Sequence, residues 1–404
     1  MQKLICILAL TASSLFGACH TNDCSPCDPC QTCDPCDTCC CNPCCCEPCD
    51  FVPPCPPDTC AYNAPVEIDI KCGCDFFLTG SFVYFQAKEE NLEYINTFLI
   101  TYLNESGSGS SGNDIEINSG KMCFDYEPAF RVGLGMTFGC DDWAFYAEYF
   151  RYHADVGTGS FFQVNSNNSD TELEASFLWV PNNNGGSDIV TPEVNTEVTA
   201  NTKWRLEMDL VDFNLSRRYF VGRCLTFQPH FGLRAGWIDQ KYTATYVSVG
   251  ADGPRTVTFD VESSTESWAI GARAGINTDW KFCGCFFLFG NSAFSILYTD
   301  YDKITFERTH LREQEGTEDL HGTFTIPKRE LCYLRPQLDI GLGLGWADYF
   351  CCNDWYFDLR AGYEFHTFWN QNMFPKTYKS AFDPLATGGD LYLRGLVITA
   401  RLDF

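Results

Sequence analysis

The chain has 404 residues and a formal net charge of −26 at pH 7, from 53 Asp and Glu against 27 Lys and Arg. This balance excludes nucleic acid as a partner, because the chain would repel phosphate. Aromatic residues make up 15% of the chain, with 34 Phe, and there are 32 Gly; this mix is typical of strands with aromatic girdles. No run of 18 apolar residues follows the N-terminal leader, which excludes a helical membrane protein.

Residues 1–18 predict a secretory signal peptide. Lys3 precedes the apolar run 4–10, and small residues lead to Gly17 and Ala18, a pattern too short for a membrane anchor. Residues 15–19 also resemble a lipobox that would lipidate Cys19, but Phe16 fits that motif badly, so lipidation stays open. The mature chain is expected to be exported.

Residues 19–75 predict a disordered periplasmic arm rich in Cys and Pro. Many of its cysteines recur at every third position, its prolines block helices and ladders, and it has few apolar side chains to bury. Eighteen of the 26 cysteines precede Asp75. Exported thiols oxidise, so disulfides are favoured over a zinc or copper site, for which only His20 is near. No cofactor is expected, and thiolate metal binding by the arm is the alternative.

Residues 76–404 predict an all-β fold, because apolar and polar residues alternate in one segment after another. Phe130, Val132 and Leu134, for example, alternate with Arg131 and Gly133, which marks a strand with one apolar and one polar face. Ten strands are expected, at 76–87, 125–138, 143–153, 203–216, 224–249, 256–280, 285–308, 322–346, 355–367 and 391–404. Weaker alternation at 92–101 and 171–180 leaves twelve or more strands open.

The links between these strands differ in length at the two ends of the predicted sheet. The short links are 139–142, 217–223, 281–285 and 347–354, whereas mostly longer, polar links run over 88–122, 153–202, 310–320 and 369–389. Outer-membrane barrels are built this way, with the short turns on the periplasmic side.

The last strand ends on an aromatic residue, Phe404, and its residues Leu396, Ile398 and Leu402 share one phase. Outer-membrane barrels close on such a strand, with the terminal ring at the periplasmic interface and the apolar phase toward lipid. An ordinary edge strand would look the same by itself, but the other strands favour a single antiparallel transmembrane β-barrel of about 10–12 strands.

Charged residues on the polar phase are candidates for lining a pore. They are Arg131, Arg234, Arg273, Arg335, Asp339, Asp358, Arg360 and Glu364. The five arginines are expected near mid-depth, where rings of charge select ions. In the alternative, the acids pair with the arginines and simply pack a narrow barrel.

Cysteines are candidates for disulfides in the arm and at the short turns. The candidates are Cys24, Cys27, Cys30, Cys33, Cys36, Cys39, Cys72, Cys74, Cys140, Cys224, Cys283, Cys285, Cys351 and Cys352. Six of the eight cysteines beyond Asp75 thus fall on the expected periplasmic side, within reach of the arm. The predicted partners are other copies of the chain or other cysteine-rich envelope proteins.

Three stretches within residues 76–404 stand out. They are 128–135 (Pro-Ala-Phe-Arg-Val-Gly-Leu-Gly), 210–215 (Leu-Val-Asp-Phe-Asn-Leu) followed by 228–240, and 362–365 followed by 369–371. Together they resemble the chlamydial and Legionella-type major outer membrane protein-like pores. The resemblance implies an outer-membrane pore-forming protein, in organisms whose envelopes depend on disulfide cross-linking. The cysteine arm departs from the usual family pattern.

The sequence therefore predicts an outer-membrane porin that passes small polar solutes or ions by diffusion, with disulfides that stiffen the envelope. The alternative is a structural or adhesive coat protein with little pore activity. No enzyme is expected, because the glycine runs 133–135 and 341–345 lie inside strands and the six histidines show neither a metal spacing nor a nucleophile partner. Lipid is the expected surrounding partner, and the oligomeric state stays open.

Overall fold

The computed structural model describes residues 76–103, 112–138, 143–163, 170–174, 197–221, 224–249, 255–283, 285–314, 317–350, 355–374, 376–378, 381–383 and 388–404. The predictions for residues 1–75, namely the signal peptide, the arm and the cysteines from Cys24 to Cys74, lie outside the described residues. So do Cys140, Cys351 and Cys352.

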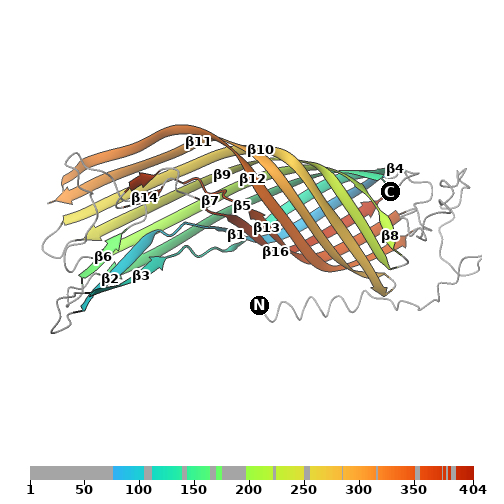
Figure 1. The fold of residues 1–404 in the computed structure, drawn as a ribbon, viewed down its shortest axis with the longest axis horizontal. Helices are drawn as coiled ribbons and strands as arrows, with labels where there is room; N and C mark the ends of the chain where they lie inside the picture. Colours follow the sequence, from blue (N-terminus) through green and yellow to red (C-terminus); the bar gives the residue numbers. More distant parts are fainter. Residues whose placement is uncertain are drawn as a thin grey trace, which may run out of the picture.

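Ten strands form a closed antiparallel barrel (Figure 1). In wall order they are β1 (Phe76–Glu89), β4 (Tyr126–Phe138), β5 (Trp143–Gln163), β7 (Glu197–Arg217), β9 (Leu225–Val249), β10 (Arg255–Cys283), β11 (Phe286–Gln314), β12 (Thr317–Phe350), β13 (Trp355–Phe368) and β16 (Leu391–Asp403). The first and last strands pair with each other, with Phe77 opposite Asp403, and this pairing closes the barrel. The prediction of an all-β antiparallel barrel is confirmed, with ten strands.

Short strands lie at the two ends of the barrel. The three-residue β8 (Tyr219–Val221) follows β7 and pairs with the start of β9. At the long-loop end, β2 (Ile95–Leu103) pairs with β3 (Gly112–Gly120) and β6 (Asp170–Glu174), and β14 (Lys376–Tyr378) pairs with β15 (Ala381–Asp383). The weakly alternating piece 92–101 and residues 171–174 of the second piece thus contribute to a separate sheet and add no strand to the barrel, while residues 175–180 lie outside the described residues.

Several strands are longer than the sequence predicts. The stretch 310–320, expected to be a loop, is mostly strand, since β11 reaches Gln314 and β12 starts at Thr317. The expected loop 153–202 likewise gives residues to β5 and β7. At about 3.3 Å per residue the 29 residues of β11 extend far beyond the 9–11 residues that cross a bilayer. Beyond the bilayer, the outer face of a strand does not have to be apolar. The strand pairing therefore continues past the point where the alternation of apolar and polar residues, which predicts a strand, ends.

The barrel wall reverses its polarity along its length. In the short-turn half, Leu233 is 53% exposed on the outside, while Arg234 is 6% exposed on the inside. In the long-loop half, Leu206 and Met208 are fully buried inside, while Glu207 faces out. The apolar outer band of the short-turn half suits lipid, and the long-loop half is built like a water-soluble barrel around an apolar core.

Glycines on the inner face make room for aromatic rings in a narrow lumen. A Cβ atom on Gly135 would overlap the ring of Phe77, and one on Gly345 would overlap the ring of Phe287. These glycines belong to strands β4 and β12, as the sequence predicts. Only glycine allows a ring from the neighbouring strand to lie flat against the wall at these two positions.

The C-terminal residue ties the last strand to the first. The backbone N–H of Phe404 donates to the carbonyl of Phe76 at 3.0 Å, and the Phe404 ring packs 5.9 Å from that of Trp355. The described residues include no helix long and apolar enough to cross a membrane.

Candidate functional site

The lumen at the level of the apolar outer band holds a network of buried ion pairs centred on Asp339 of β12. Arg234 of β9 donates from Nη1 to Asp339 Oδ2 at 2.9 Å, and Arg273 of β10 contacts the same oxygen. Arg234 also makes a two-pronged contact with Asp212 of β7, with Nε to Oδ1 at 2.6 Å. On the other side, His366 Nδ1 lies 2.7 Å from Asp339 Oδ1.

The network continues to the opposite wall through Glu364 of β13. His366 Nε2 lies 3.0 Å from Glu364 Oε2, and Arg131 Nη2 of β4 donates to the same oxygen at 2.6 Å. These contacts cross the lumen, because β1 and β16 separate β4 from β13 in the wall. The charges therefore form one connected band inside the barrel.

A second pairing lies nearer the short turns. Arg360 Nη1 donates to Asp279 Oδ1 at 3.0 Å, and Arg360 Nη2 donates to Asp358 Oδ2 at 2.8 Å. Its guanidinium also stacks 4.9 Å from the centre of the Phe287 ring. An Arg held by two carboxylates and a ring is strongly oriented.

The predicted lumen residues thus fall into two groups. Arg131, Arg234, Arg273 and Arg360 each contact a carboxylate, and Asp339, Asp358 and Glu364 are among their partners. Arg335 lies apart, in the long-loop half, where its guanidinium stacks 4.5 Å from the Tyr333 ring and its Nη2 lies 3.1 Å from Met373 Sδ. The four arginines face acids, and no open ring of five guanidinium groups forms.

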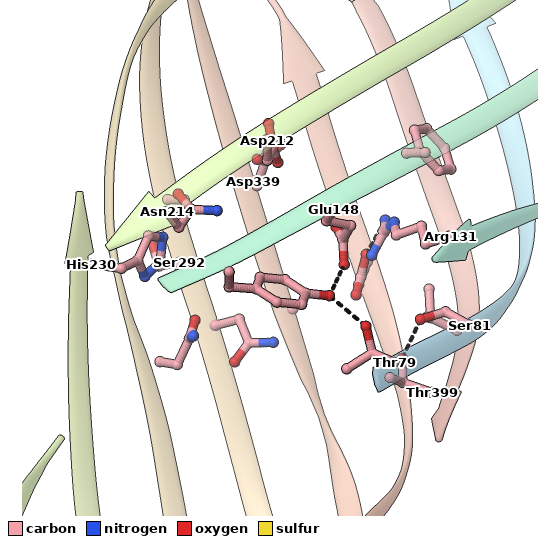
Figure 2. A pocket seen from close by; sticks show the side chains of 18 of the residues that line it. Thr79, Ser81, Arg131, Glu148, Asp212, Asn214, His230, Ser292, Asp339 and Thr399 are labelled. Atoms are coloured by element: carbon pink, nitrogen blue, oxygen red, sulfur yellow. Dashed lines mark hydrogen bonds and ion pairs between the residues drawn. The ribbon is translucent and has the colours of Figure 1, made fainter. Parts of the chain in front are cut away.

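A cavity of about 260 Å³ runs through the charged band (Figure 2). Its lining reaches Phe368 and Leu393 toward the long loops, and Phe77 and Arg401 toward the short turns. Within it, the Tyr146 hydroxyl bridges Glu148 and Thr79, with oxygen–oxygen distances of 2.7 and 2.6 Å.

Residues 369–374 follow β13, and the last four of them are buried in the interior of the barrel. Asn372 and Phe374 are fully buried, and the Phe374 ring packs 6.1 Å from that of Tyr242 on β9. Asn372 Nδ2 donates to the Glu90 carbonyl at 2.7 Å, and its Oδ1 accepts from the Phe374 N–H at 2.9 Å. We call residues 369–374 the inserted segment.

The inserted segment lies within the predicted polar loop 369–389, so its interior position differs from the expectation of a surface loop. The adjacent apolar residues Met373 and Phe374 are the one sequence signal that could have revealed it. Both are buried in the structure, Met373 with 6% of its surface exposed.

Above the cavity, one apolar cluster fills the interior. It takes residues from most barrel strands and includes Phe85, Trp204 and Phe374. The buried polar groups within it are joined, because Trp204 Nε1 donates to Gln240 Oε1 at 3.1 Å and Gln240 Nε2 donates to Glu89 Oε2 at 3.4 Å. The cluster and the buried residues 371–374 thus pack the described interior on the long-loop side of the cavity.

The described cysteines lie at both ends of the barrel and in the middle of one strand. Cys224 and Cys285 are at the short-turn rim, where their carbonyls accept from the backbone N–H groups of Lys281 and Ala347 at 2.7 and 2.9 Å. Cys123 precedes β4 at the long-loop end, Cys332 lies in the middle of β12, and both are exposed. Cys283 ends β10, and its side chain is outside the described set. No disulfide joins the cysteines whose side chains are described.

The described histidines do not gather into a metal centre. His366 lies in the charged band and His230 beside the cavity, whereas His153 is exposed on the outer wall. Over the part of the chain that the structure describes, no group of three or more His, Cys, Asp or Glu could hold a metal ion.

Solved structures with similar folds include outer-membrane proteins of several kinds. The outer membrane protease OmpT from Escherichia coli matches with 9% identity and a TM-score of 0.32, over 81% of this chain and 96% of that one. A Pseudomonas aeruginosa FadL homologue matches with 10% identity and a TM-score of 0.20, over 81% and 89%. The Pseudomonas putida toluene transporter TodX matches with 7% identity and a TM-score of 0.19, over 81% and 89%.

Two comparisons of the sequence with known proteins differ in outcome. No curated protein matches the chain. Residues 74–404, which include the whole barrel, match the family described as the Legionella pneumophila major outer membrane protein precursor. The outer-membrane location agrees with the apolar band around the short-turn half of the barrel. The chain is therefore an outer-membrane β-barrel protein that belongs to the family of the Legionella major outer membrane protein.

Proposed function

We propose that this chain is a porin, without enzymatic activity, that passes small polar solutes or ions across the outer membrane by diffusion. The observation that carries the proposal is the lumen. A closed barrel with an apolar outer band encloses a charged interior with a cavity of about 260 Å³ at the depth of that band. A polar lumen inside a lipid-facing wall is the basic arrangement of a porin.

For this pore to conduct, the packed interior of the long-loop half must change. The inserted segment and the apolar cluster obstruct the lumen, so the conformation described is a closed one. Passage requires the inserted segment to withdraw and the apolar cluster of the wall strands to rearrange. Residues 388–390 connect the inserted segment to the last strand, and the Gly389 carbonyl accepts from the Asn372 N–H at 3.0 Å. Diffusion through this pore is therefore intermittent.

Planar bilayer recordings on the purified full-length protein test the proposal. We expect discrete openings of uniform size separated by closed periods, because one segment controls the lumen of each barrel. Replacing Arg234 and Arg273 with Ser should shift selectivity toward cations, since Asp212 and Asp339 would lose their main counter-charges. A protein that inserts and folds but never conducts would contradict the proposal.

A structural or adhesive coat protein with little pore activity is the second candidate. The packed interior of the long-loop half favours it, because Trp204, Leu206 and Met208 fill space that an open pore leaves to water. Under this function the bilayer recordings would show no openings, even after the inserted segment is released.

For the remainder of the chain we propose an exported protein whose residues 19–75 lie in the periplasm and form disulfides, with the signal peptide removed. The short-turn rim, with Cys224 and Cys285, would then face the arm. Disulfides between chains, or with other cysteine-rich envelope proteins, would make a covalent mesh that stiffens the envelope.

Non-reducing gels of isolated outer membranes test the mesh. We expect high-mass ladders that collapse to a monomer on reduction, and deletion of residues 19–60 should shrink the ladders while the barrel still folds. A monomer without reductant would reject the mesh and leave metal binding by the thiolates of the arm as the alternative.

A further inference from the structure

The carboxyl group of Glu89 is buried in the long-loop half of the barrel without a positively charged partner. Glu89 ends β1 and is 2% exposed. Its Oε2 accepts only a long hydrogen bond, from Gln240 Nε2 at 3.4 Å, and its Oε1 accepts none within the described part of the chain. No Arg, Lys or His side chain that the structure describes forms an ion pair with it. A buried carboxylate normally requires such a partner.

The charged and titratable groups around Glu89 do not supply one. Glu90, in the turn after β1, and Asp390, just before β16, add negative charge nearby. From β9 the neighbour is the neutral amide of Gln240, and from β11 it is the neutral hydroxyl of Tyr301. Arg335 of β12 packs over the Tyr301 ring and against the inserted segment instead. The surroundings of Glu89 therefore oppose its ionisation from every side.

Burial keeps the Glu89 carboxyl protonated in the conformation described. The residue lies beyond the apolar outer band, since Tyr84 is the last apolar residue on the outer face of β1. Burial, together with the negative charges of Asp390 and Glu90, raises the pKa of the Glu89 carboxyl well above its usual range. The neutral form suits the apolar cluster, whereas the ionised form would be an unpaired charge inside it.

Glu89 lies where the inserted segment is attached to the wall. The carbonyl of the next residue, Glu90, accepts from Asn372 Nδ2 at 2.7 Å. The Tyr301 hydroxyl, which is close enough to Glu89 to respond to its charge, donates to the Gln371 carbonyl at 3.3 Å. A negative charge at Glu89 would thus arise beside two of the contacts that hold the segment.

We propose that Glu89 is a pH-dependent switch for the inserted segment: while its carboxyl is protonated the segment stays packed in the interior, and loss of the proton favours the withdrawn segment. As a statement about pore opening, this rests on the proposed porin function and adds a means of regulation. As a statement about the position of the segment, it can be tested without any transport.

The direction of the pH dependence follows from proton binding. A Glu exposed to water has a pKa of about 4.3, so Glu89 ionises above that pH once the segment has withdrawn and water reaches it. The packed state keeps its proton to higher pH and therefore binds one proton more. Each pH unit then favours the withdrawn state by up to about tenfold, until the raised pKa of the packed state is passed.

Hydrogen exchange of the full-length protein in lipid vesicles tests the switch, with measurements at about pH 5.5 and about pH 7.5. The backbone N–H groups of Asn372 and Phe374 report on the segment, because both donate hydrogen bonds in the packed state. We expect their protection factors, which correct for the intrinsic effect of pH on exchange, to fall at least tenfold between the two conditions. Residues 130–134 of β4, in the lipid-facing wall, should keep theirs.

Variants of Glu89 separate its proton from other effects of pH. Glu89→Gln keeps the size of the side chain and cannot ionise, so the segment should be equally protected at both pH values. Glu207→Gln, which neutralises an exposed carboxylate on the outer wall of β7, is the matched control and should behave as the wild type does. If Glu89→Gln does not fold, Glu89→Met, an apolar side chain of similar length, gives the same comparison.

Two results would overturn the switch: protection factors of the wild type that do not change with pH, or an equal change in a folded Glu89 variant. The open fraction in bilayer recordings over the same pH range should rise at least tenfold in the wild type and stay constant in Glu89→Gln. Release of the segment without conductance would instead reject the porin function and leave the switch standing. Conductance without pH-dependent release would do the reverse.

Discussion

Replacing Asp339 with Ala is expected to destabilise the barrel by about 3–5 kcal/mol, because it removes the shared partner of two buried arginines. Asp339 is 6% exposed, and it also accepts from Gln337 Nε2 at 2.9 Å. Arg273 would keep a longer contact to the Asp212 carboxylate, at 3.7 Å, and a hydrogen bond of 3.5 Å to Ser295 Oγ. Urea unfolding of the purified protein measures the change. In bilayers the same variant should shift toward anion selectivity, since positive charge is left uncompensated in the lumen.

The matched control is an ion pair of similar length on the outside of the same barrel. Asp155 and Arg205 lie 3.1 Å apart, with side chains 59% and 58% exposed. Exposed pairs contribute at most about 1 kcal/mol, so Asp155→Ala should be nearly neutral. Asp339→Asn, which keeps hydrogen-bonding capacity but loses the charge, should fall between the two. Equal losses for Asp155→Ala and Asp339→Ala would show that the buried network does not stabilise the barrel.

Releasing the inserted segment is expected to raise the open fraction of the pore, and with it the mean conductance, at least tenfold. The double variant Asn372→Ala and Phe374→Ala removes the side chain that bonds the Glu90 carbonyl and the fully buried ring against Tyr242. Loss of a buried Phe side chain alone costs about 3–5 kcal/mol, and each 1.4 kcal/mol changes a population tenfold. Without these contacts, the inserted segment should therefore spend far more time withdrawn from the lumen. The open fraction in single-channel recordings is the measurement.

The control for the inserted segment is Asn370→Gly. Asn370 lies in the same turn, is exposed, and has a backbone φ of 54°, which glycine adopts without strain. This variant should conduct like the wild type. If the Asn372 and Phe374 variant folds and its open fraction does not rise, the inserted segment does not gate the lumen.

The barrel could be predicted from the sequence because lipid forces a period of two on every crossing strand. The outer phase of β4, with Phe130, Val132 and Leu134, is as exposed as the alternation indicates. The strand ends toward the long loops could not be predicted in this way, since the wall there faces water. The reversal of polarity does leave a signal. Adjacent apolar residues interrupt the alternation where it occurs, as at Leu210 and Val211 on β7.

The candidate site was harder to predict, because its contacts cross the lumen. Arg131 and Glu364 are 233 positions apart and are not neighbours in any ladder. Alternation places both on the inner face, but only the diameter and tilt of the finished barrel decide that they touch.

The polarity reversal means that one half of the barrel folds in lipid and the other half in water, so that different forces stabilise the two halves. Around the short-turn half, lipid chains are as apolar as the side chains they touch, so folding there depends on backbone hydrogen bonds and buried ion pairs. The long-loop half removes Trp204, Leu206 and Tyr242 from water and gains the hydrophobic effect. That effect weakens on cooling. Cold should therefore loosen the apolar cluster and the inserted segment while the lipid-embedded wall stays intact, so that the pore opens more readily as the temperature falls.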